Sequence, residues 1–168
     1  MSLKLHLGVF ELPYTTHVPE VGRRAVARLR KGGSPEKFTS APAGAETTGD
    51  VASILEAEYH IIEIFYQANQ QAIADFVAAS MAGALETMLM GGPPPKDPLA
   101  QAYADIEKLF KNFILSGAIE SLGVPGVPTQ AALDGVNHAL KLKKGPRRPS
   151  FKDTGLYMSA FHTWSSNG

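Results

Sequence analysis

Residues 50–92 read DVASILEAEYHIIEIFYQANQQAIADFVAASMAGALETMLMGG and lie within the longest proline-free run of the chain. Proline breaks helix interiors, so one helix can extend through this run. Its apolar residues recur at helical spacing. They are Val51, Ile54, Leu55, Ile62, Phe65, Ile73, Phe76, Val77, Met81, Ala84, Leu85 and Met88. The pattern predicts a helix over about 50–90 that ends before Gly91.

Such a helix would be about 60 Å long, which exceeds the diameter of a domain of this size. Two arrangements resolve the conflict. Either the helix breaks near residues 67–71, or it projects from the domain and packs against neighbouring subunits. At its start Asp50 can act as the N-cap, with Thr47 and Thr48 as rivals.

Two further helices and two strands follow from the same reasoning. A helix over 98–115 would begin after an Asp97 cap, with Phe110 and Phe113 on its apolar stripe. A shorter helix is expected over 130–142, capped by Thr129. Apolar residues alternate over 3–9, which is strand periodicity, and the C-terminal stretch can also be extended.

These elements predict an α+β fold that is rich in helix, in which long helices pack on a small antiparallel sheet formed with the chain termini. With 168 residues, the chain is expected to be a single domain, 1–168. Residues 31–49 are rich in Gly, Pro, Ser and Ala, and they predict an extended loop or arm. The sequence shows no internal repeat and no coiled-coil heptad.

Composition excludes several classes of protein. The chain has no cysteine, so disulfide scaffolds, cysteine-ligated zinc sites and thiol enzymes are excluded. The net charge is zero, which is unusual for a free-standing nucleic-acid binder. No uninterrupted run of 18 apolar residues occurs, so we expect no membrane-spanning helix and no membrane partner. We also expect no secretory signal.

Charge is segregated along the chain. Residues 46–90 carry seven acidic groups and no Lys or Arg, whereas 1–45 and 141–168 are basic. The segments can be separate solvated surfaces, or they can meet between subunits, where complementary charge sets orientation. The candidate intersubunit charges are Arg23, Arg24, Arg28, Lys141, Lys143, Lys144, Glu56, Glu63, Asp75 and Glu86.

The sequence gives little support for a catalytic or ligand-binding site. Asp153-Thr154-Gly155 spells the aspartic-protease triplet, but only thirteen residues follow it and a second copy is absent. His60 and Glu63 lie one helical turn apart without further metal-ligand spacing. Phosphate-binding and nucleophile-elbow motifs do not occur. We therefore expect no enzyme activity, no catalytic residue, no cofactor and no metal.

The segment RPSFKDTGLYMSAF, residues 148–161, is the most distinctive in the chain. It resembles the C-terminal signature of small neck proteins of tailed bacteriophages, the tail-completion and head–tail joining family. The matching positions are Thr154, Gly155, Tyr157, Ser159 and Phe161. In the commonest form of that motif the serine lies one place further from the glycine.

The resemblance implies a structural virion protein that forms a ring in the head–tail neck, through which the genome passes. It implies as partners further copies of the chain and neighbouring neck, connector or tail proteins, with packaged DNA passing nearby. It also implies location in the virion neck or tail after assembly in the host cytoplasm. Two alternatives remain: a tail terminator or other tail ring protein, and an intracellular helical adaptor.

Overall fold

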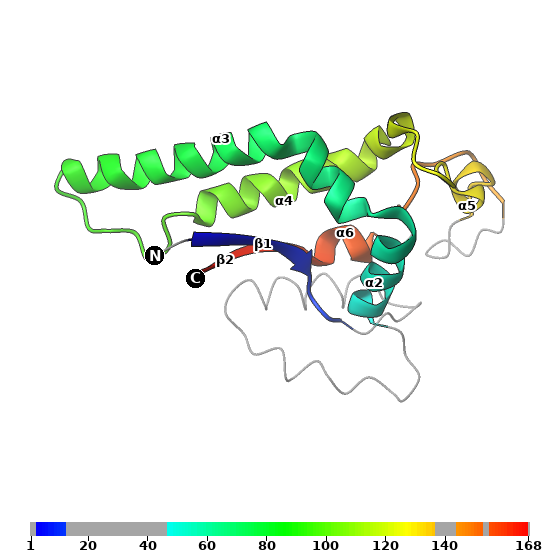
Figure 1. Cartoon of the computed structure of the whole chain (residues 1–168), viewed down its shortest axis with the longest axis horizontal. Helices are drawn as coiled ribbons and strands as arrows, with labels where there is room; N and C mark the ends of the chain where they lie inside the picture. Colours follow the sequence, from blue (N-terminus) through cyan, green and yellow to red (C-terminus); the bar gives the residue numbers. More distant parts are fainter. Residues whose placement is uncertain (1–2, 13–46, 137–143, 153–154, 168) are drawn as a thin grey trace.

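The two ends of the chain pair in one antiparallel sheet, as the sequence predicts. Strand β1 (Leu3–Val9) lies beside β2 (Phe161–Asn167), with Leu3 opposite Asn167 and Val9 opposite Phe161. The computed structural model describes residues 3–12, 47–136, 144–152 and 155–167. Its helices and this two-stranded sheet make the protein an α-rich α+β fold, which confirms the predicted class (Figure 1).

The sheet has two different faces because side chains alternate along a strand. Leu5, Leu7 and Val9 pack against the hydrophobic core. The opposite face carries a row of stacked rings, in which Trp164 lies between His6 and His162 with centroid separations of 5.3 and 5.9 Å. Phe10 extends the row by stacking on His162 at 4.3 Å.

The predicted long helix is divided in two. Helix α2 (Thr48–Tyr59) is capped by Thr47, which forms a capping box with Asp50, so Asp50 occupies the third helical position and is not the cap. His60 adopts a left-handed conformation (φ 50°, ψ 43°) and ends α2. The prediction of one continuous helix is therefore wrong at His60, and α3 (Ile61–Leu89) continues in a new direction.

Helix α3 is also interrupted where the sequence suggested a break. Asn69 has non-helical angles (φ −125°, ψ 17°), and its side-chain amide donates a 2.8 Å hydrogen bond to the carbonyl oxygen of Phe65. A side chain that competes for the backbone in this way weakens the helical ladder locally. The break within 67–71 is thus a single-residue kink, and the helix continues to Leu89.

Helix α4 (Ala100–Leu115) runs beside α3, and together they cover the inner face of the sheet (Figure 1). It begins two residues later than predicted, because the Asp97 carboxylate accepts a 2.9 Å hydrogen bond from the Leu99 N–H and caps a preceding turn. Buried Glu107 of α4 contacts His162 Nδ1 at 2.8 Å and accepts the Thr163 N–H at 3.3 Å. This carboxylate therefore ties α4 to β2.

The core is built around aromatic rings from three elements. Phe110 stacks on Phe161 at 3.9 Å, and Phe65 meets both of them edge-on. Phe110 and Phe113 are both buried, which confirms the predicted stripe of α4. Aromatic contacts of this kind stabilise beyond the area that they bury.

The remaining described elements are short. They are the 3-10 helix η2 (Ala118–Leu122), α5 (Gln130–Leu133) and α6 (Leu156–Ala160). Thr129 caps α5 as predicted, but the helix ends at Leu133, because Gly135 takes a left-handed conformation (φ 66°). The predicted extent to residue 142 is therefore wrong over 134–136, and residues 137–142 lie outside the described part of the chain.

The predicted arm at 31–49 ends earlier than expected. Thr48 and Gly49 belong to α2, and residues 31–46 lie outside the described residues. Thr48 is fully buried. Its hydroxyl accepts a 2.8 Å hydrogen bond from the Leu12 N–H and donates one to the Phe10 carbonyl oxygen. The backbone N–H of Thr48 donates to the Leu12 carbonyl oxygen at 2.7 Å. Thr48 thus fastens the start of α2 to the chain that follows β1.

Candidate assembly surface

The C-terminal motif lies at the corner between α6 and β2. Gly155 (φ 75°) precedes the first residue of α6, and the Ser159 hydroxyl donates to the Leu156 carbonyl at 3.0 Å. Tyr157 and Phe161 are buried in the core, and Thr154 lies outside the described residues. The described motif residues therefore position β2 and support the core.

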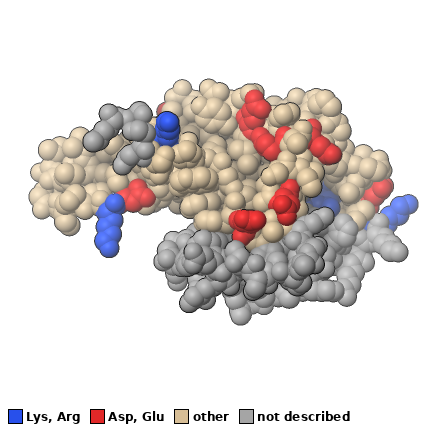
Figure 2. Space-filling model, turned by 60° about the horizontal axis from the view of Figure 1, so that its bottom comes forward, with Lys and Arg blue, Asp and Glu red and all other residues tan. Residues whose placement is uncertain are grey.

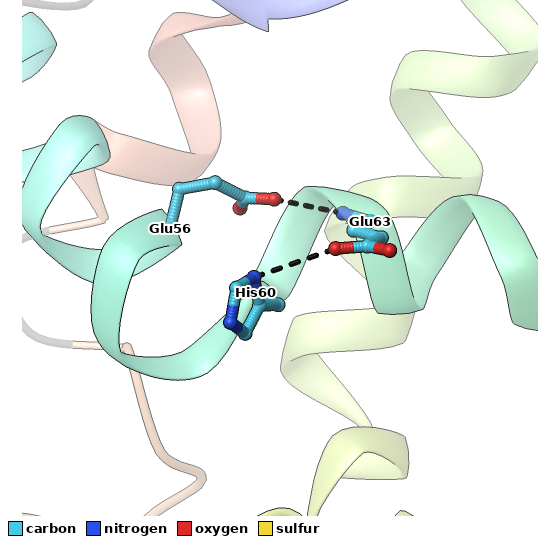
Figure 3. A group of neighbouring side chains, drawn as sticks. All are labelled: Glu56, His60 and Glu63. Carbon is cyan, nitrogen blue, oxygen red and sulfur yellow. Dashed lines mark hydrogen bonds and ion pairs between the residues drawn. The ribbon is translucent and has the colours of Figure 1, made fainter.

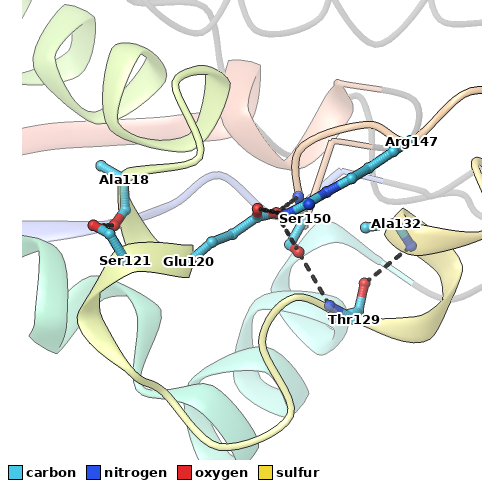
Figure 4. A network of polar contacts seen from close by, with 7 residues as sticks. All are labelled: Ala118, Glu120, Ser121, Thr129, Ala132, Arg147 and Ser150. Atoms are coloured by element: carbon cyan, nitrogen blue, oxygen red, sulfur yellow. Dashed lines mark hydrogen bonds and ion pairs between the residues drawn. The ribbon is translucent and has the colours of Figure 1, made fainter.

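Upstream, the motif is anchored by a polar network around Glu120 of η2 (Figure 4). Its carboxylate accepts hydrogen bonds from the N–H and hydroxyl of buried Ser150, both at 2.9 Å, and pairs with Arg147 at 2.8 Å. Burial raises the pKa of Glu120, but the bonds from Ser150 and Arg147 outweigh it, so the pKa is lowered from its usual 4.5. Ser150 also accepts the Thr129 N–H, at 3.1 Å. The network therefore joins η2, the residue before α5 and residues 147–150.

Tyr157 carries an unpaired polar group in the core. Its hydroxyl is buried and has no hydrogen-bond partner among the described residues. Burial, together with the nearby charge of Glu56, raises its pKa. An unsatisfied buried hydroxyl makes the folded state less stable. The aromatic ring of Tyr157, and not its hydroxyl, therefore explains why this residue lies in the core.

The junction of α2 and α3 brings together Glu56, His60 and Glu63, although the sequence offered only the last two as a pair (Figure 3). One ligand atom of each lies within 4.8 Å of the others. Both oxygens of Glu56 already accept backbone N–H groups, from Ile62 at 2.8 Å and Glu63 at 3.1 Å. Glu56 therefore caps the N-terminus of α3, which accounts for the cluster without a metal.

The other predicted charges are solvent-exposed where the structure describes them. Asp75 and Glu86 lie on α3, and the Asp75 carboxylate accepts a 2.8 Å hydrogen bond from Gln71. Lys144 is exposed. On the face shown in Figure 2, most acidic side chains gather over one half of the described surface. The predicted basic partners Arg23, Arg24, Arg28, Lys141 and Lys143 lie outside the described residues.

A groove lies between β1 and α3, with a volume of about 610 Å³. Its walls are mostly apolar, and the lining residues with polar side-chain groups are Glu56, Glu63, Tyr66 and Gln70. Since Glu56 already caps α3, the polar groups left over are the Glu63 carboxylate, the Gln70 amide and the Tyr66 hydroxyl. They do not form a nucleophile–base pair or a cation-lined anion site, so the groove is best described as apolar surface.

The side of α3 that carries Glu63 and Met81 borders hollows beside the sheet, and it changes character along its length. Near its start this side carries Glu63, Gln67 and Gln71. Beyond Asp75 the residues at the same angular position, at about 3.6 residues per turn, are apolar. The large ones, Met81 (47%), Leu85 (57%) and Met88 (50%), are all exposed, and Leu89 (79%) and Met90 (82%) at the end of the helix are exposed as well. The solvent-facing side of a helix normally carries charged and polar residues, so an exposed apolar surface of this kind is unusual for a monomer.

The same half of α3 projects past its neighbour in the fold. Helix α3 has 29 residues and α4 has 16, so their lengths are about 44 Å and about 24 Å. Figure 1 shows the end of α3 extending beyond the start of α4. The sequence allowed either a broken helix or a projecting helix. The structure combines the two, because α3 is kinked at Asn69 and its second half extends beyond α4.

By length and composition, α3 is also a helix that could cross a membrane, and 6% of its most apolar window is buried. The sequence criterion of an uninterrupted apolar run overlooked it. Ile61, Phe65 and Ile73 of α3 are core residues, however. Residues 74–89 alone are shorter than the roughly 20 residues that span a bilayer.

Comparison of the chain with protein-family models, with curated proteins and with solved structures found no match. The functional argument therefore depends on the surfaces described above and on the resemblance of the C-terminal motif.

Proposed function

We propose that this protein is a non-enzymatic structural protein of a tailed bacteriophage that assembles as a ring in the head–tail neck. The observation that carries the proposal is the exposed apolar half of α3, a surface typical of a subunit that is covered after assembly. The motif at 148–161 resembles the C-terminal signature of phage neck proteins, and this resemblance is the reason for placing the ring in the head–tail neck. The proposed location is the neck or tail of the virion, after assembly in the host cytoplasm.

The distribution of charge supports association between copies. Acidic groups are concentrated on α2 and α3, and the sequence outside 46–140 is basic. Opposite charges on one chain can be satisfied between neighbouring subunits, where they set orientation more than affinity. The proposed partners are further copies of the chain and the neck, connector or tail proteins above and below it, with DNA passing through the ring.

Negative-stain electron microscopy of the purified protein, together with light scattering after gel filtration, tests the ring. Closed rings of uniform diameter are expected. A protein that remains monomeric at high concentration would contradict the proposal. Rising ionic strength should loosen the rings if exposed charge pairs join the subunits, because such pairs are screened beyond about 8 Å at physiological salt.

Antibody labelling of particles of the phage that encodes the protein tests the setting. Label between head and tail is expected. Label along the tail tube or at its far end would contradict the neck assignment and favour a tail ring protein, and absence from particles would favour an adaptor.

A further inference from the structure

Each strand of the two-stranded sheet has one edge that faces away from the other strand. Helix α4 covers this edge of β2, where the Glu107 carboxylate accepts the Thr163 N–H at 3.3 Å. The corresponding edge of β1 makes no hydrogen bond in the described part of the chain. Such an edge presents unpaired N–H and C=O groups, with which another extended chain can form a strand ladder.

The register identifies the backbone groups on the open edge. Opposite residues of an antiparallel pair alternately exchange hydrogen bonds and point their backbone groups away from the neighbouring strand. The Phe10 N–H donates to the Ala160 carbonyl oxygen at 2.9 Å, and these two residues continue the register of β1 and β2. Counting back in steps of two, the N–H and C=O groups of Leu3, Leu5 and Leu7 point away from β2.

The groove of about 610 Å³ lies beside this edge and has the length of a short strand. Leu5 and Leu7 form its wall on β1, and residues within 62–77 of α3 form most of the other wall. That stretch of helix spans about 23 Å, which is the length of about seven residues of extended chain. Side chains alternate along a strand, so every second side chain of an added strand would enter the groove.

The residues that line the groove determine which side chains fit it. Ile73, Ala74 and Val77 make one end apolar, which suits aliphatic side chains. The other end carries the carboxylates of Glu56 and Glu63, and the described lining includes no Lys or Arg. The Glu63 side chain is 54% exposed, so it remains accessible to a cation from a partner.

We propose that the open edge of β1 binds an extended segment of another protein, which adds antiparallel to β1 as a third strand of the sheet. The segment carries aliphatic residues at every second position and a Lys or Arg at its N-terminal end. This interaction goes beyond the proposed function, since it does not require the protein to be a neck component.

The orientation follows from the direction of β1 along the groove. Leu3 shares a second hollow with Met81, whereas the far end of β1 lies near α2 and the start of α3 (Figure 1). The acidic end of the groove therefore lies near Leu7. Antiparallel pairing, which is slightly more stable per residue than parallel pairing, puts the N-terminus of the added segment at this end, beside Glu63.

The β1 strand of a second copy fits the groove less well. Paired antiparallel in the same sheet, it would turn its leucines toward the groove and its Lys4 toward the opposite face. Glu63 would then face no cation. A segment of a different protein, with its cation on the aliphatic side of the strand, matches both ends of the groove.

Amide hydrogen exchange of the full chain tests whether the edge is open. The N–H groups of Leu5 and Leu7 should exchange quickly, whereas those of His6 and Gly8, which point toward β2, should exchange slowly. Protection of Leu5 and Leu7 in the protein alone would overturn the proposal, because the edge would already be paired.

A synthetic peptide, Lys-Thr-Val-Thr-Val-Thr-Val with both ends blocked, tests binding. Its addition should slow exchange at Leu5 and Leu7. The same peptide with N-methylated valines keeps its side chains but loses N–H groups that face β1, so it should bind about tenfold more weakly or worse. Equal binding of the two peptides, or binding of neither at millimolar concentration, would overturn the proposal.

A charge exchange tests the acidic end of the groove. The wild type should prefer the peptide that begins with Lys over one that begins with Glu, and Glu63→Lys should reverse this preference at low salt. Glu58→Lys is the control, since Glu58 is exposed on α2 and does not line the groove. It should keep the wild-type preference. Equal changes in both variants would overturn the proposed contact with Glu63.

Sedimentation separates a second copy from a different protein as the occupant. The peptide should bind without changing the oligomeric state of the wild type. A wild-type dimer that the peptide converts to monomers would identify β1 of a second copy as the occupant, and it would overturn the proposed partner.

Discussion

The indole ring of Trp164 lies directly over Gly8 of the neighbouring strand. A Cβ on Gly8 would come within 2.9 Å of Cη2 and 3.1 Å of Cζ3 of Trp164, which is closer than real Cβ contacts. The ring cannot shift freely, because His6 and His162 stack on it. Glycine at position 8 is therefore needed by the aromatic row on the outer face of the sheet.

Gly8→Ala should lower the free energy of unfolding by about 1–3 kcal/mol, the usual cost of overpacking. It should also change the emission of Trp164, the one tryptophan of the chain. Urea unfolding followed by fluorescence measures both. In the control, Gly83→Ala should leave the emission unchanged and stabilise α3 by about 0.5–1 kcal/mol. Identical behaviour of the two variants would contradict the described packing.

Phe110→Ala should lower the free energy of unfolding by about 3–5 kcal/mol, because Phe110 is fully buried between Phe65 and Phe161. Leu115→Ala on the same helix, at a 42% exposed residue, should change it by about 0.5 kcal/mol or less. Thermal or urea unfolding compares the two. A small loss for Phe110→Ala would show that α4 is rotated relative to the described packing.

The network of Glu120 predicts a pH dependence of stability. The pKa of Glu120 is lowered in the folded chain, so its ionised form stabilises folding above the usual value of 4.5 and this contribution is lost as the pH falls through the folded pKa. Glu120→Gln should therefore be less stable than the wild type at neutral pH, and the difference should shrink in acid. Urea unfolding across this range measures it, and a difference that grows in acid would contradict the sign.

Tyr157→Phe should keep or raise the stability of the protein, by up to about 1 kcal/mol, because it removes a buried hydroxyl that has no partner in the described part of the chain. Urea unfolding is again the measurement. Tyr103→Phe provides the contrast, since the Tyr103 hydroxyl donates a 2.6 Å hydrogen bond to Ser165 and its loss should destabilise. A loss at Tyr157 as large as that at Tyr103 would show that the Tyr157 hydroxyl has a partner.

Periodicity correctly predicted the elements that are determined by residues close to one another in sequence. The alternation over 3–9 and the apolar stripe of α4 were confirmed, since each depends only on residues within a few positions. The ends of helices were predicted less well. The left-handed His60 and the early end of α5 at Leu133 depend on local competition for backbone hydrogen bonds, which apolar spacing does not report.

The candidate site shows the same division. The sequence identified α3 as overlong and apolar, and that followed from composition alone. It did not separate the buried Phe65 and Ile73 from the exposed Met81 and Leu85, because apolar spacing does not report which side of a helix the rest of the chain covers.

The sequence by itself determined the periodicity of the main helices and strands and the segregation of charge, because these depend on residue type and spacing. Only the tertiary structure decided which side of α3 is covered. That choice depends on the length of α4, which packs along part of α3 and, among the described elements, leaves the rest without a helix beside it. Burial is a property of distant segments meeting in space, and helical periodicity is the same whether or not such a segment arrives.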